Sequence, residues 1–245
     1  MRRRLTYSLF DALDKGSGSL SPDALKAVCR YARSQAPDGC SFINRAAKSD
    51  LYYTMFGWTV SYVLGIGIRG SQRRRLLHKT NPAALDEMHL TAFLILKQLH
   101  RLMMLPKGMG NLLLKIMSPD AVLLDFLSGY RGHGSGGGTN AWALSLLLDN
   151  DEKASECIKR MQDPSGGFLS NSGAAIPDML STAAALFALK CSGISPMFSP
   201  MEFIEAHWQD NGSFMDNLAD GAADIEYLFY GLLALGSANI KICRK

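Results

Sequence analysis

The chain has 245 residues, of which 47% are hydrophobic and 20% charged, and its formal net charge is +4. This composition supplies a large buried core and excludes a disordered chain, and its basicity is too mild to indicate a nucleic-acid partner. No apolar run reaches the roughly 18 residues needed for a membrane span. Five cysteines without a CxxC pair favour a reducing, cytoplasmic setting.

The first predicted element is a helix at the N-terminus. Segment 1–16 begins with basic residues, as a signal peptide does. Its apolar stretch, however, is short and is interrupted by Ser8, Asp11 and Asp14. We therefore expect this segment to be a helix of the mature fold.

Further along the chain, five predicted helices are apolar on nearly all sides. Their starts lie about 37 to 48 residues apart, a period that indicates a repeat architecture. The residues at these starts are Asp50, Glu87, Ser135, Asp178 and Asp224. Side chains of these types accept hydrogen bonds from the free N–H groups of a first turn and complement the helix dipole, so we expect N-caps.

Helices with charges on one face alternate with the apolar ones. They are predicted at 21–35, 70–80, 118–129, 149–163 and 199–210. A helix that is apolar on all sides is buried on all sides, so the alternation implies an inner and an outer layer. We predict one all-α domain over residues 1–245, an α/α toroid of about five to six helix pairs. Because only five inner helices are evident, either the N-terminal helix supplies a sixth or the ring is incomplete.

Three of the apolar helices follow a turn with the same order of residues, a Gln, a Gly and a Phe. The three sets are Gln35, Gly39 and Phe42; Gln162, Gly166 and Phe168; and Gln209, Gly212 and Phe214. Together with the helices at 177–189 and 223–236, these turns resemble the repeats of the protein prenyltransferase β-subunit and squalene or terpene cyclase superfamily. The resemblance is strongest over about residues 160–236. It implies an α/α barrel with an axial cavity for an isoprenoid or similar lipid, and a helical partner subunit or self-association.

The functional residues of that superfamily are only partly present. Prenyltransferase β-subunits hold zinc with an Asp, a Cys and a His; Asp178 matches the first, but Leu180 and Tyr227 occupy the other two positions. The segment before Asp178 also has no basic residue to hold a diphosphate. The nearest string to the cyclase motif Asp-x-Asp-Asp, residues 149–152, is more typical of a helix cap. We therefore assign no metal ligand, and the cofactor stays open.

Equivalent repeat positions lie at one end of such a barrel, so the acids at the helix starts are expected to converge there. Asp178 and Asp224 are the candidate catalytic residues. Aromatic and histidine side chains near the helix starts are candidate substrate-binding residues, namely Tyr52, Tyr53, Phe56, His89, Trp142, Tyr227 and Tyr230. Their rings either line an isoprenoid pocket, where they could stabilise a carbocation, or fill the axis as packing.

Basic residues concentrate at 69–79, which we expect to be a solvated outer face; the alternative is contact with an anion such as diphosphate or a membrane surface. Arg73 to Arg75, His89, Arg131 or His133 would replace the missing diphosphate anchor only if the fold brought them to the cavity mouth. Two functions stay open. The protein is either an enzyme that acts on a prenyl substrate, or a non-catalytic binding or protein-interaction module that keeps the toroid.

Overall fold

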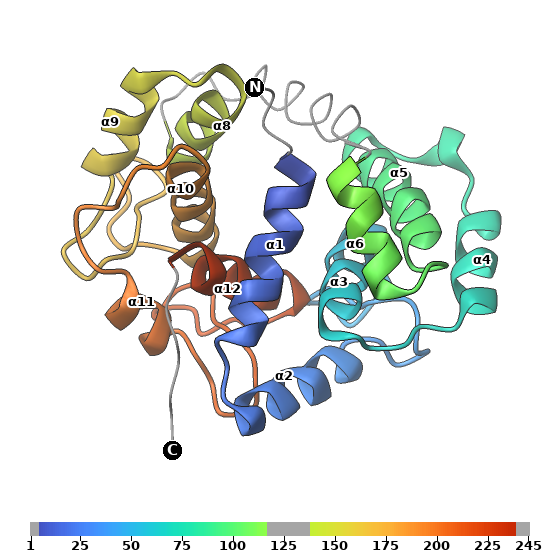
Figure 1. Cartoon of the computed structure of the whole chain (residues 1–245). Coiled ribbons are helices and arrows are strands. Elements are labelled where there is room, and N and C mark those ends of the chain that lie inside the picture. Colours follow the sequence, from blue (N-terminus) through green and yellow to red (C-terminus); the bar gives the residue numbers. More distant parts are fainter. Residues whose placement is uncertain (1–4, 117–137, 239–245) are drawn as a thin grey trace.

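The computed structural model describes residues 5–116 and 138–238, and this part of the chain is all-α, as predicted (Figure 1). The described residues form eleven α-helices and one 3-10 helix, and their extended segments make only isolated β-bridges. The α-helices are α1 (Leu5–Gly18), α2 (Pro22–Ser34), α3 (Leu51–Leu64), α4 (Gly70–Lys79), α5 (Glu87–Leu102), α6 (Lys107–Ile116), α8 (Thr139–Asp149), α9 (Glu152–Arg160), α10 (Met179–Cys191), α11 (Met201–Ala206) and α12 (Ile225–Ala238), and the 3-10 helix is Pro82–Ala84. The predicted helix at 118–129 lies outside the described residues.

Carboxylate caps set the starts of three buried helices. Asp50, Asp178 and Asp224 precede α3, α10 and α12, and each accepts hydrogen bonds from backbone N–H groups of the first turn at 2.7 to 3.4 Å. These groups have no partner inside the helix, so the side chain satisfies what the backbone cannot. The predicted capping role of the three acids is confirmed.

The other two apolar helices begin at different residues from those predicted. Asp86, and not Glu87, caps α5, because its short side chain accepts a hydrogen bond from the backbone N–H of His89, three residues further on, at 2.8 Å. Ser135 lies outside the described residues, but the helix that it was expected to open begins at Thr139, with Gly138 at the N-cap. The N–H of Thr139 donates to the carbonyl of Ser170 at 2.9 Å, which fixes this start against a neighbouring loop.

Glycines reverse the chain before α3, α10 and α12. The backbone angle φ is 73° at Gly39 and 94° at both Gly166 and Gly212, a region that strains any residue with a side chain. At Gly166 and Gly212 a Cβ would also overlap the backbone of a neighbouring segment. The predicted glycine turns are therefore confirmed, and two of them are sites of close chain approach.

The Phe of each turn is buried and is anchored to the helix that follows. Thr182 of α10 accepts a hydrogen bond from the backbone N–H of Phe168 at 2.8 Å, and α3 makes the equivalent bond at 3.0 Å. The ring of Phe214 packs on Gly231 of α12, where a Cβ would overlap the ring. The recurring threonine and small residues thus hold each turn against its own helix.

The buried helices lie side by side in the spatial order α8, α10, α12, α3, α5, which is their order in the chain with the last of them, α12, placed beside the first, α3. In Figure 1 they form an arc, and the amphipathic helices α4, α2, α11 and α9 lie on its outer side. Among the described residues, no helix is both long enough and apolar enough to span a membrane.

Helix α1 lies inside the arc and does not extend it at either end. It packs against α12, α3 and α10, and it occupies the middle of Figure 1. The contact with α12 brings backbones together, since a Cβ on Gly16 or Gly236 would overlap a carbonyl oxygen of the other helix. Small residues at a crossing allow this close approach.

Candidate functional site

The starts of α3 and α12 bring polar side chains together at one end of the arc. The guanidinium of Arg45 pairs with Asp224, with Nε and Oδ2 at 3.0 Å, and its Nη2 donates to the hydroxyl of Tyr227 at 2.7 Å. The hydroxyl of Tyr52 on α3 donates to Glu226 Oε1 of α12 at 2.6 Å. Both sets of contacts join segments that are far apart in the chain.

Asp216 connects this cluster to the start of α10. Its backbone carbonyl accepts from the N–H of Met179 at 2.8 Å. Burial raises the pKa of Asp178 and also that of Tyr227, and the charge of Asp216 raises both further. Asp178 and Tyr227 thus have a common neighbour.

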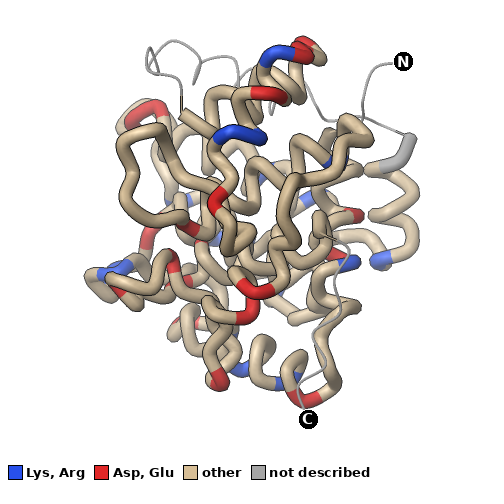
Figure 2. The backbone as a smooth tube through the Cα atoms, turned by 90° about the vertical axis from the view of Figure 1, so that its left-hand side faces the viewer, with Lys and Arg blue, Asp and Glu red and all other residues tan. Residues whose placement is uncertain are grey.

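We call the carboxyl groups of Asp178, Asp216, Asp224 and Glu226 the acidic end. Within the described part of the chain one arginine, Arg45, pairs with it, through Asp224. Over the fold as a whole, basic and acidic positions are interspersed (Figure 2), so this local excess of carboxyl groups is not a property of the whole chain.

Glu226 is the acid that titrates near neutrality. Its residue is only 8% exposed, and burial raises the pKa of its carboxyl to about 7. The hydrogen bond from Tyr52 opposes this rise and the charge of Asp224 adds to it. Near pH 7 this side chain therefore exists in both protonation states.

Asp178 and Asp224 use their oxygens to hold structure. Asp178 accepts from the backbone N–H of Ser181 at 2.7 Å with one oxygen and from its hydroxyl at 2.9 Å with the other. Asp224 is 3% exposed and divides its two oxygens between the N–H groups of α12 and Arg45. Carboxylates that are satisfied in this way are poorly placed to take a proton from a substrate.

The predicted substrate-binding rings on α3 and α12 contact one another. The centroid of Phe56 lies 5.0 Å from those of Tyr52 and Phe229 and 5.7 Å from that of Tyr230, and Tyr53 lies 5.6 Å from Tyr52. These are the separations of packed aromatic pairs. The rings therefore fill the space between the two helices.

Trp142 and His89 have other surroundings. Trp142 lies on α8, half-buried against the hydrophobic core. His89 begins α5, where its Nδ1 is 2.7 Å from Asp86 and its Nε2 is 3.6 Å from Asp50. Burial acts to lower the pKa of His89, but the two carboxylates outweigh it and raise the pKa overall. His89 therefore links the starts of α5 and α3 through ion pairs.

Neither a metal site nor a diphosphate anchor is found among the described residues of the acidic end. The described part of the chain holds no group of three or more His, Cys, Asp or Glu that is arranged to bind a metal ion. Arg73 contacts Met103, at the opposite end of α5 from His89. A helix of 16 residues is about 24 Å long, so Arg73 is far from the acidic end. Arg131 and His133 lie outside the described residues.

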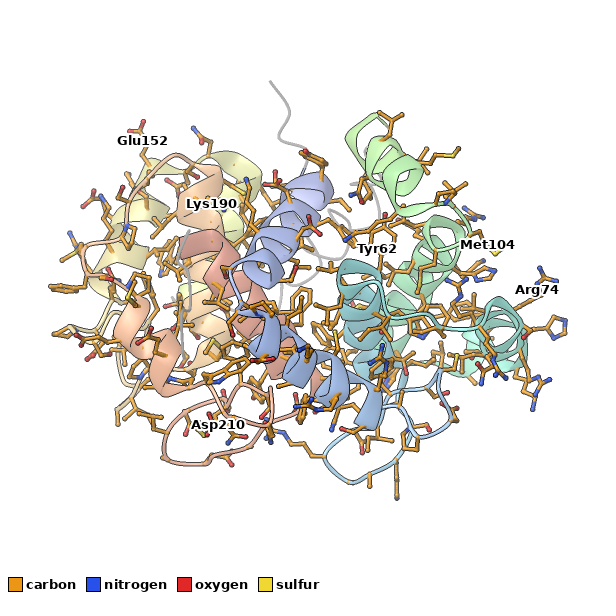
Figure 3. The ribbon with its side chains drawn as sticks, turned by 60° about the horizontal axis from the view of Figure 1, so that its bottom comes forward. Tyr62, Arg74, Met104, Glu152, Lys190 and Asp210 are labelled. Atoms are coloured by element: carbon orange, nitrogen blue, oxygen red, sulfur yellow. The ribbon has the colours of Figure 1, made fainter. Side chains whose placement is uncertain are left out.

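A cleft of about 420 Å³ lies elsewhere, between α1, α3 and α6. Its walls include Tyr7, Phe10 and Tyr62, and Tyr62 stands between α1 and α6 in Figure 3. Lys107 crosses its edge and pairs with Asp14 at 2.9 Å. This cleft contains none of the candidate residues of the sequence analysis.

Three residues of the polar cluster were not among the sequence candidates: Arg45, Asp216 and Glu226. Glu226 follows the cap Asp224 by two positions, a spacing that could have indicated a second acid at the same helix start. Arg45 and Asp216 lie in loops, where no periodic pattern marks them. Only the tertiary fold places them beside α10 and α12.

Comparisons of this chain with protein-family models, curated proteins and solved structures give no match. Function must therefore be argued from the chemistry of the site.

Proposed function

We propose that this chain is a non-catalytic binding module, built on an α/α toroid of the prenyltransferase type, and that its acidic end binds a cationic group of a partner protein. The arc of buried helices with amphipathic helices outside it fits such a toroid. Helix α1 packs on the inner side of the arc, where the family resemblance would place a substrate cavity.

The proposal is carried by four carboxyl groups that influence one another: the charge of Asp216 acts on Asp178 and on Glu226, and the charge of Asp224 acts on Glu226. Asp178, Asp216 and Glu226 have no arginine or lysine within 4 Å in the described chain, and only Asp224 is paired with Arg45. Burial raises the pKa of Asp178 and of Glu226, which means that their ionised forms lack sufficient compensation. A cation bound beside them would supply it.

The same groups are poorly suited to catalysis. Two of the acids are satisfied helix caps, the aromatic rings pack on one another, and the described residues offer no metal-binding group. A helical partner subunit, which the family resemblance implies, is the kind of protein that would present a basic side chain here.

The experiment uses a fluorescent oligoarginine peptide and measures its anisotropy as the purified protein is added. We expect saturable binding that weakens as salt rises, because salt screens exposed charges. Asp216→Asn should weaken binding several-fold, since it removes a charge that caps no helix. Glu156→Gln removes an exposed charge from the outer helix α9 and is the matched control. Absence of binding at low salt, or an equal effect of both substitutions, would refute the proposal.

A second candidate is an enzyme that acts on a prenyl substrate, and the observation that favours it is the Glu226 and Tyr52 pair. A buried carboxyl whose pKa is about 7 can both give and take a proton near neutrality. Purified protein should be tested for stoichiometric zinc or magnesium and for consumption of a panel of prenyl diphosphates. Turnover that Glu226→Gln abolishes, without loss of the folded state, would replace the binding module with the enzyme.

A further inference from the structure

Helix α4 begins without a side-chain cap. Its N-cap residue, Arg69, makes no capping hydrogen bond, and no acidic residue lies in the first turn. The first N–H groups of a helix have no acceptor within it, and they carry about half a positive charge. An anion is therefore favoured at this position, but a bare helix start alone does not define a site.

Arg73 places a buried cation beside this helix start. The residue is 4% exposed, and its Nη2 lies 3.6 Å from where a Cβ on Gly70 would stand. Nη2 donates to the carbonyl of Met103 at 3.2 Å, but Nε has no hydrogen-bond partner among the described residues. Burial lowers the pKa of Arg73, with only the Cys40 thiol opposing. A buried arginine normally has a carboxylate or several acceptors, whereas Arg73 has a single carbonyl among the residues that the structure describes.

His100 adds a second unsatisfied group from the end of α5. Its Nδ1 is buried and has no hydrogen-bond partner within the described ranges. Burial lowers the pKa of His100, and the charges of Arg73 and Arg74 lower it further. None of these three side chains pairs with a carboxylate in the part of the chain that the structure describes. The dipole of α5 places only about half a negative charge at its carboxyl end, which is less than the positive charge of Arg73 and Arg74.

We propose that the start of α4 and the end of α5 form a binding site for a phosphate group, held by the first N–H groups of α4 with Arg73, Arg74 and His100. Phosphate oxygens accept several charge-assisted hydrogen bonds at once, from a helix start and from guanidinium groups. The side chain of Arg74 projects from the outer side of the molecule in Figure 3, so this residue of the proposed site faces solvent. The site lies at the opposite end of α5 from the acidic end and does not depend on the proposed function.

A purely structural role accounts for only part of this arrangement. Arg73 holds the end of α5 through Met103, and that contact uses one of its nitrogens. It leaves Nε of Arg73 and Nδ1 of His100 without hydrogen-bond partners among the described residues. If the role were structural alone, added phosphate would change neither the titration of His100 nor the stability of the protein.

The test follows the pKa of His100 by NMR of histidine-labelled protein, with inorganic phosphate or pyrophosphate added at constant ionic strength. We expect a saturable rise in this pKa, because a bound anion stabilises the charged imidazole. Arg74→Gln should abolish the rise, and Arg75→Gln, which removes an equal charge from the next exposed position, should keep it. The resonances of His89 and His207 serve as internal controls. The same loss in both variants would overturn the site.

A second arm separates a soluble phosphate from a lipid headgroup. Sedimentation with vesicles that contain phosphatidic acid is compared with sedimentation with phosphatidylcholine vesicles. Binding to the first kind alone, lost in Arg74→Gln and kept in Arg75→Gln, supports the site with a lipid as its source. If neither the soluble anions nor these vesicles bind, the proposal is wrong.

Discussion

The contact between α1 and α12 can be tested with a single methyl group. In Gly236→Ala the new Cβ would overlap the carbonyl oxygen of Ala12 and would stand 2.7 Å from the backbone nitrogen of Gly16. Both neighbours are backbone atoms, so no side chain can rotate to make room. Helix α1 must move, and it would lose part of its packing on α12, α3 and α10.

The magnitude follows from two opposed effects. Alanine favours a helix over glycine by about 1 kcal/mol, which alone would stabilise α12. Overpacking a well-filled interior costs about 1 to 3 kcal/mol, and a clash with backbone lies at the upper end of that range. We expect the free energy of unfolding to fall by about 2 kcal/mol.

The assay is urea denaturation followed by circular dichroism, with Gly108→Ala as the control. Gly108 also lies in a helix, but a Cβ there meets open space, so this variant should be as stable as the wild type or slightly more stable. If Gly236→Ala behaved like Gly108→Ala, α1 would not lie against α12 as described, and the account of a filled inner side would be wrong.

Three further predictions concern the helix starts and their contacts. The pKa of Glu226 is raised from 4.5 to about 7, so between these two pH values the native state binds more protons than the unfolded state. The stability of the wild type should therefore fall as pH rises from 4.5 to 7, by at most about 3 kcal/mol. Urea denaturation at pH 5 and pH 8 should show that Glu226→Gln does not lose stability in this way. If the variant had the same pH dependence as the wild type, the raised pKa would not belong to Glu226. Asp178→Ala should lower stability by about 1 kcal/mol in urea titrations through loss of the α10 cap, and no loss would show that the cap is not needed. Thr182→Val leaves the buried N–H of Phe168 without its acceptor and should cost about 1 to 3 kcal/mol by the same assay, whereas a neutral effect would argue against this anchor.

Local signals in the sequence predicted much of the helical framework. An acid before an apolar run identified the starts of α3, α10 and α12, because a cap acts on the next three residues only. Glycine identified the turns, because the positive φ is a local requirement. Where two acids are adjacent, as in Asp86 and Glu87, the pattern could not tell which one caps the helix. That depends on which side-chain oxygen can accept from the N–H groups of the first turn.

The site depends on contacts that no local pattern contains. Arg45 and Asp224 are 179 positions apart, and Tyr52 and Glu226 are 174 apart. The repeat frame predicts that the helix starts share one end, but not which loop residues join them there. The place of α1 was missed for a related reason. Glycine in a helix weakens it, and only the tertiary structure shows that Gly16 permits a close crossing.

The most direct test of a cation-binding acidic end is the pKa of Glu226, measured by NMR of the labelled side-chain carboxyl with and without the oligoarginine peptide. A cation bound beside this carboxyl favours its ionised form, so the account predicts that the pKa falls clearly below about 7 when the peptide saturates the protein. A pKa that stays the same at saturation would show that the peptide binds elsewhere, and the proposed role of the acidic end would then be wrong.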